Sequence, residues 1–93
     1  MIIRKLKPVQ FERIHQELIQ KAHTQPLDAS YTVNMSINNI PYSIKIQPEH
    51  NCKLAILQAL RIERDEDGPS FKLITNNNLL SSLLEILIYQ GVG

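Results

Sequence analysis

The chain has little cysteine, no tryptophan and almost no net charge. Its 93 residues include the single cysteine Cys52, and the formal net charge is +1. One cysteine cannot form an intrachain disulfide, so we expect a reducing compartment and a cytoplasmic protein. The balanced charge gives no global electrostatic reason to expect a nucleic-acid or anionic-membrane partner.

Long apolar runs are also absent. The first residues carry three charges, on Arg4, Lys5 and Lys7, without an apolar stretch behind them, which does not fit a secretory signal. The longest apolar run lies near the C-terminus and is far shorter than the ~20 residues of a membrane span. Hydrophobic residues still make up 43% of the chain, as in ordinary globular proteins. We expect one small domain over residues 1–93.

Strict alternation of apolar and polar residues marks the stretches 31–37 and 40–46. This alternation is typical of strands with one buried face. Asn38 and Asn39 separate the two stretches, and asparagine tolerates the positive φ that a two-residue type I′ turn requires. The sequence therefore predicts a hairpin.

The predicted turn fixes the register of this hairpin, with Val33 opposite Ile44. A slip by one residue would turn every apolar side chain to the other face. In this register the missing N–H of Pro41 points away from the first strand, so we predict that this end of the second strand is a sheet edge. Pro48 would owe its N–H to the first strand, so the strand should end near Gln47.

Two amphipathic helices are predicted at either side of the strands. Residues 8–23 place one apolar face on the same arc, and Pro8 suits the first turn. That face consists of Phe11, Ile14, Leu18 and Ala22, with Ile19 on its flank. The asparagines at 76–78 offer an N-cap for a last helix over 79–89.

The segment 51–64 fits two patterns. Its first half has helical spacing, and a helical turn over 50–58 is one alternative; its second half alternates like a strand. We predict a second hairpin, residues 54–64 with 70–75, joined by the acidic loop 65–68. Its cross-strand pairs would be Leu60 with Leu73 and Ile62 with Phe71.

The order helix, hairpin, hairpin, helix predicts an α+β fold. Its form would be an antiparallel four-stranded sheet with both helices on one face. This outline is similar to small secretion chaperones, which bind partners through sheet edges and dimerise through a helix. It is also similar to double-stranded RNA-binding domains. Their last helix begins with a basic cluster, whereas residues 76–81 contain no Lys or Arg, which argues against RNA binding.

The residues with potential site chemistry do not form a recognised motif. His15 and His23 are eight residues apart rather than at the i,i+4 spacing of strong zinc motifs. Cys52 follows His50 in an H-x-C pair without an evident base or orienting group, which favours a buried structural thiol. Residues 65–67 lack the closing glutamate of a calcium loop. We therefore expect no metal, no cofactor and no enzymatic activity.

The last helix has more apolar surface than one sheet can cover. Its apolar residues span an arc of about 200°, roughly twice what packing on a single layer requires. Either the first helix or another molecule must cover the surplus. We predict a non-enzymatic, homodimeric protein–protein interaction module, which would be an adaptor, an inhibitor or a small chaperone-like protein. Leu84 and Ile88 would lie on the outer flank of the helix. The predicted contact residues are Leu80, Leu84, Leu87 and Ile88, with Pro41 on an edge strand as a second surface.

The alternative function is a nucleic-acid-binding accessory protein. It would use the short basic arm of Arg4, Lys5 and Lys7, because such arms can contact phosphate.

Overall fold

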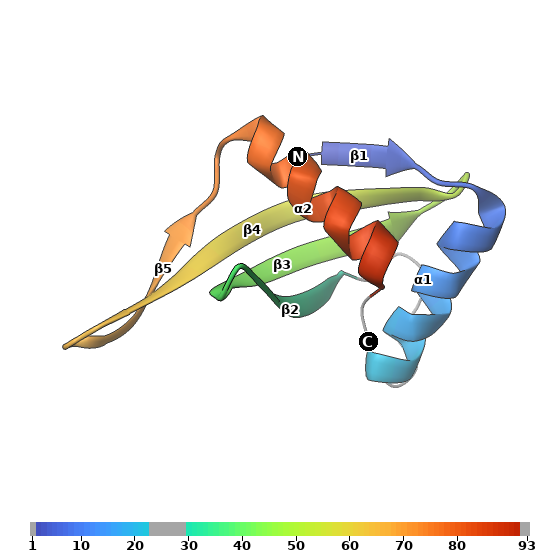
Figure 1. Ribbon diagram of the computed structural model, residues 1–93. Coiled ribbons are helices and arrows are strands. Elements are labelled where there is room, and N and C mark those ends of the chain that lie inside the picture. The colour runs from blue at the N-terminus through green and yellow to red at the C-terminus, as the bar shows by residue number, and fades with distance from the viewer. Residues whose placement is uncertain (1, 23–29, 92–93) are drawn as a thin grey trace.

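The computed structural model describes residues 2–22 and 30–91, and it has two helices and an antiparallel sheet (Figure 1). This confirms the predicted α+β class, but the sheet has five strands rather than four. His23 and the side chain of Ala22 lie outside the described residues. The elements in chain order are β1 (Ile2–Lys5), α1 (Pro8–Ala22), β2 (Tyr31–Ile37), β3 (Ile40–Glu49), β4 (Lys53–Asp65), β5 (Gly68–Leu73) and α2 (Asn77–Gln90).

The sheet is organised around β4, which is 13 residues long. β3 pairs along one side of β4, and β2 pairs with the far side of β3. The other side of β4 is shared: β1 pairs with residues 53–56, and β5 pairs with residues 60–65. β2 therefore forms one edge of the sheet, and β1 and β5 together form the other.

The first hairpin has the predicted register. Val33 lies opposite Ile44, and both side chains are buried. Asn38 and Asn39 adopt φ of 52° and 65°, as a type I′ turn requires. The sequence alone was sufficient here because the turn and the apolar pattern specify the same pairing.

β3 as a whole is not an edge strand, because it lies between β2 and β4. The local argument about Pro41 still holds. The ladder between β3 and β4 begins at Tyr42 opposite Arg61, so Pro41 lies just beyond it and no strand of the described residues pairs at its missing N–H.

The prediction that β3 ends near Gln47 is wrong, since the strand continues to Glu49. Pro48 stays in the strand because β4 supplies its partner, Leu54. Its missing N–H faces the β2 side, where the described pairing ends at Ile46.

A β-bulge in β4 explains the ambiguous segment. Ile46 pairs with Ile56 and Lys45 pairs with Gln58, so Leu57 is an extra residue in the strand. The core-facing positions are Leu54, Ile56 and Ala59, with a spacing of two and then three residues. That spacing looks helical in sequence, although the segment is a strand and the alternative of a helical turn over 50–58 is wrong.

The second hairpin has the predicted pairs, Leu60 with Leu73 and Ile62 with Phe71. Its loop is shorter than predicted. Asp65 pairs with Gly68, so only residues 66–67 form the turn. Gly68 has φ of 109°, a conformation that favours glycine.

Both helices pack their apolar residues into one core with the same face of the sheet, which we call the helix-side face. The opposite side is the back face. Helix α2 is capped by Asn76, whose side chain accepts hydrogen bonds from the N–H groups of Asn78 and Leu79. The buried residues from the helices and the loop before α1 are Leu6, Ile14, Leu18, Leu80, Leu83, Leu84, Leu87 and Ile88.

The assignment of an exposed outer flank to α2 is wrong. Leu84 and Ile88 are both buried, whereas Leu79 of the same helix is 38% exposed. Part of the surplus apolar arc is covered by α1, which contributes Ile14 to the shared core and whose Arg13 guanidinium donates to the Ile88 carbonyl. Leu80 and Leu87 are buried as well, so none of the four predicted helix residues is available to a partner in this structure.

Candidate protein-binding surface

The second hairpin projects beyond the rest of the sheet. The ladder between β3 and β4 ends at Arg61, so the outer parts of β4 and β5 form a two-stranded ribbon. Figure 1 shows this ribbon extending away from both helices. We call residues 60–73 the arm.

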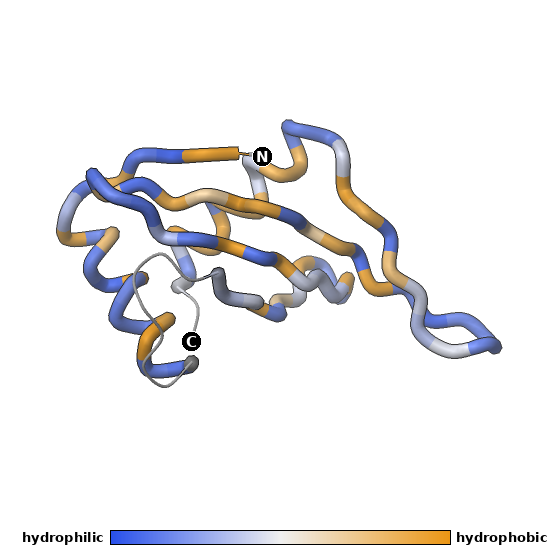
Figure 2. Tube along the Cα trace, turned by 180° about the vertical axis from the view of Figure 1, so that it is seen from behind, coloured by the Kyte–Doolittle hydropathy of each residue, from blue (hydrophilic) through white to orange (hydrophobic). Residues whose placement is uncertain are grey.

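One face of the arm is apolar. Leu60 pairs with Leu73 and Ile62 pairs with Phe71, and all four side chains lie on the back face because the bulge reverses the alternation of β4. Phe71 is 59% exposed and Leu73 is 58% exposed. None of the four belongs to the core or packs against it. Figure 2 shows apolar residues of both arm strands from behind.

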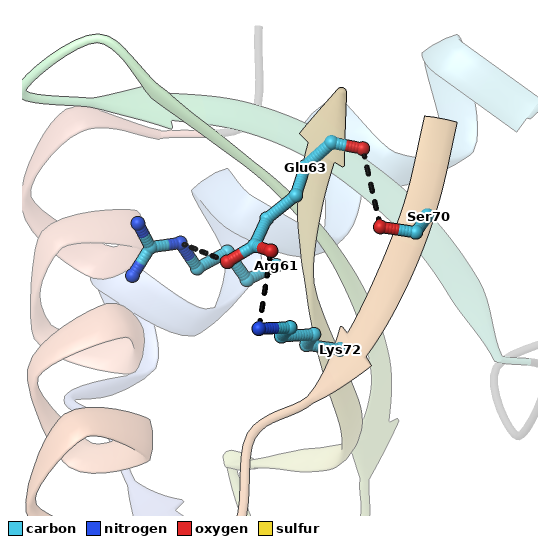
Figure 3. Close-up of polar contacts among 4 residues, drawn as sticks. All are labelled: Arg61, Glu63, Ser70 and Lys72. Carbon is cyan, nitrogen blue, oxygen red and sulfur yellow. Dashed lines mark hydrogen bonds and ion pairs between the residues drawn. The ribbon is translucent and has the colours of Figure 1, made fainter. Parts of the chain in front are cut away.

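The other face of the arm is polar and neutralises its own charges (Figure 3). The Glu63 carboxylate lies 3.2 Å from Lys72 Nζ and 3.6 Å from Arg61 Nε. The Ser70 hydroxyl donates to the Glu63 carbonyl at 3.5 Å. Exposed ion pairs of this kind stabilise the ribbon only slightly. The arm is therefore an amphipathic ribbon whose apolar side is open at Phe71 and Leu73.

An uncovered apolar ribbon is unfavourable in water. A two-stranded hairpin is only marginally stable unless a third strand or another layer covers it. Single exposed apolar residues are common, whereas exposed apolar neighbours such as Phe71 and Leu73 form the kind of patch that often marks an interaction surface. Covering Phe71 and Leu73 would contribute about 1–2 kcal/mol for each side chain. The arm thus has the physical chemistry of a contact surface.

The three basic residues near the N-terminus, which were the alternative nucleic-acid site, do not form a cluster. Arg4 lies on β1 and makes an ion pair with Glu85 of α2. Lys5 is the next residue of the same strand, so its side chain points to the opposite face of the sheet. Lys7 is exposed in the connection between β1 and α1. These three charges therefore do not converge on one phosphate-sized site.

The histidine and acidic candidates are also dispersed. His15 packs its ring on Phe11, with the ring centroids 5.7 Å apart, and its buried Nε2 has no hydrogen-bond partner among the described residues. Over residues 2–22 and 30–91, no three His, Cys, Asp or Glu side chains are close enough to hold a metal ion. In the acidic loop, the Asp65 carboxylate accepts a hydrogen bond from the Asp67 N–H at 3.0 Å and so forms part of the turn.

Cys52 is a turn residue rather than a fully buried thiol. It lies between β3 and β4, is partly exposed, and has φ of 59°. Its carbonyl accepts a hydrogen bond from the Leu6 N–H at 2.7 Å. The backbone of Cys52 thus joins the turn to the chain that leads into α1.

Replacing Cys52 should change stability only slightly. Cys52→Ser should keep the fold, with a loss below about 1 kcal/mol, because the thiol is partly exposed. Cys52→Gly should raise the unfolding free energy by about 0.5 kcal/mol. Glycine adopts the left-handed conformation of this position without strain, and that gain outweighs its entropy cost on folding. Urea unfolding measures both changes. A loss of several kcal/mol in Cys52→Ser would show that the thiol has a structural role.

Comparisons with known proteins add no family to this picture: no protein-family model, curated protein or solved structure matches the chain. Among the described helices, none is both long enough and apolar enough to cross a bilayer. The resemblance to secretion chaperones implied dimerisation through a helix, but the four residues of α2 that were predicted to make the contact are buried. Function therefore has to be inferred from the arm.

Proposed function

We propose that the chain is a non-enzymatic protein–protein interaction module that binds its partner through the apolar face of the arm. The observation that carries the proposal is the pair of largely exposed apolar side chains on β5, Phe71 and Leu73, which lie beside the partly buried Leu60 and Ile62 on the back face of the arm. Pro41 is exposed and lies one residue beyond Tyr42, where the β3–β4 pairing ends. Because Tyr42 faces the helices, Pro41 lies on the back face and extends the same surface. Pro41 thus keeps the interface role that the sequence indicated.

The chemistry of the arm specifies the kind of partner. Its contact face has no charge among the four central side chains, so the partner should offer apolar groups there. Phe71 is the natural anchor, because aromatic residues are enriched among the few side chains that dominate binding energy. The acidic turn at residues 65–67 would repel phosphate, which disfavours nucleic acid as the ligand of this surface.

The test is the double variant Phe71→Ser with Leu73→Ser. Both side chains are largely exposed, so the fold should persist, with a change in unfolding free energy near 1 kcal/mol. Partners are first captured with the wild-type chain from the cells that make it. Binding of each purified partner is then measured by calorimetry. We expect the double variant to bind about 100-fold more weakly, as loss of an apolar anchor predicts.

The matched control is Val9→Ser with Tyr89→Ser, which removes two exposed apolar side chains from the helices. This variant should bind like the wild type. Equal binding by the arm variant and the control would overturn the proposed surface.

A further inference from the structure

We infer that β5 pairs with β5 of a second copy of this chain, antiparallel and around a two-fold axis at Phe71. This inference rests on the proposed function, since it assigns the first partner of the same arm. It differs from that function because the contact uses the backbone edge of β5 and leaves the apolar face free.

The outer edge of β5 is free for pairing. The two-residue turn makes Asp65 and Gly68 a hydrogen-bonded pair, and such pairs alternate along the ladder. The Ile74 N–H continues the alternation, donating to the Ala59 carbonyl of β4 at 2.9 Å. Phe71 therefore directs its N–H and C=O away from β4. In the described chain no other strand pairs with that edge.

One register satisfies this edge best. With Phe71 on the two-fold axis, the two Phe71 residues exchange N–H···O=C bonds, and the Leu73 N–H donates to the Pro69 carbonyl of the other copy. Pro69 has no N–H, so the pair of Leu73 and Pro69 forms one hydrogen bond instead of two. Lys72 then lies opposite Ser70. A shift that places the axis at Lys72 would set two lysines directly opposite each other, which is unfavourable.

Charge complementarity also favours a second copy as the occupant. In this antiparallel register the turn of one arm runs past the end of the other β5, toward the start of α2. The turn carries Asp65, Glu66 and Asp67, whereas the first turn of α2 contains no acidic residue. Negative charge near a helix N-terminus is stabilising. The acidic turn would thus meet a helix end that is capped by the neutral Asn76 and carries no negative charge of its own.

The pairing has a consequence for binding. It would place the apolar faces of two arms next to each other on one side of a continuous sheet, since antiparallel neighbours keep their faces aligned. A partner would then meet twice the apolar surface that one chain offers. The dimer forms through β5, in place of the helix α2 that the sequence pattern indicated.

Cysteine cross-linking tests the register. In a Cys52→Ser background, Ser70→Cys and Lys72→Cys chains are mixed and mildly oxidised at about 10 µM to 1 mM, the range in which a small interface dimerises. The mixture should give a heterodimeric disulfide, because residues 70 and 72 are directly opposite within disulfide reach. Each variant alone should not cross-link efficiently, because its two cysteines are diagonal and about 7–8 Å apart.

Sedimentation equilibrium tests the same contact without cysteines. Ser70→Lys should raise the dimer dissociation constant about tenfold, because it sets a lysine opposite Lys72 twice across the axis. Ser81→Lys adds the same charge on the exposed side of α2 and should leave it unchanged. A wild-type monomer throughout, or efficient cross-linking of Lys72→Cys alone, overturns the inference. Partner binding that still depends on Phe71 in a monomeric chain would overturn the inference and leave the proposed function intact.

Discussion

A chain carrying Leu84→Glu should be largely unfolded at room temperature. Leu84 is 1% exposed within the core that the sheet and both helices share. Truncating a buried leucine costs about 2–5 kcal/mol, and a carboxylate without a partner adds several more. Small domains have only about 5–15 kcal/mol of stability, so the loss should exceed most of it. Far-UV circular dichroism and light scattering measure the outcome.

The control for this variant lies on the same helix. Leu79→Glu places the same charge on a side chain that is 38% exposed, in the first turn of α2, and should remain folded. A folded Leu84→Glu chain with an altered oligomeric state would show that α2 is an interface, as its wide apolar arc suggested. The two variants together separate core from interface along one helix.

Val33→Asp should have an effect of similar size. Val33 is 2% exposed and lies opposite Ile44 in the first hairpin. The aspartate would leave an unpaired carboxylate in the core, at a cost of several kcal/mol. Thermal unfolding followed by circular dichroism should show a missing or strongly lowered transition.

Asn34→Asp is the matched control, because the next residue of the strand points to the exposed face. It should change the unfolding free energy by less than about 0.5 kcal/mol, as surface substitutions usually do. Equal destabilisation by both aspartates would mean that the hairpin register is wrong.

The first hairpin could be predicted completely because its information is local. The asparagine turn and the alternating pattern specify one register, and any slip would expose a whole apolar face. Pro41 added independent information about the missing neighbour. Such agreement between turn chemistry and patterning is what makes a sequence easy to interpret.

The arm surface could not be predicted because one extra residue reverses its orientation. Without the bulge at Leu57, Leu60 and Ile62 would continue the helix-side face of β4. Their ladder partners, Phe71 and Leu73, would then be expected in the core. The sequence signal of the bulge is a mixture of strand-like and helix-like spacing. Within one strand, the core positions are separated by two and then by three residues.

Helix α2 shows the limit of an amphipathic arc. The width of the apolar arc indicates how much of the helix surface must be buried, but not which part of the protein buries it. Its cover comes partly from α1, a segment distant in sequence, through Ile14, Leu18 and the bond from Arg13 to the Ile88 carbonyl. Strand β1 was missed for a related reason, because residues 2–5 lack alternation and only the pairing with β4 defines them.

The most direct test of the arm is photo-cross-linking in the native cell. A photoreactive benzoylphenylalanine is placed at position 71, in the apolar face, or at position 9, which is 82% exposed on α1. The account predicts a discrete adduct with another protein from position 71 and none from position 9. Adducts of equal intensity from both positions, or none from position 71, would contradict a protein-binding role for the arm.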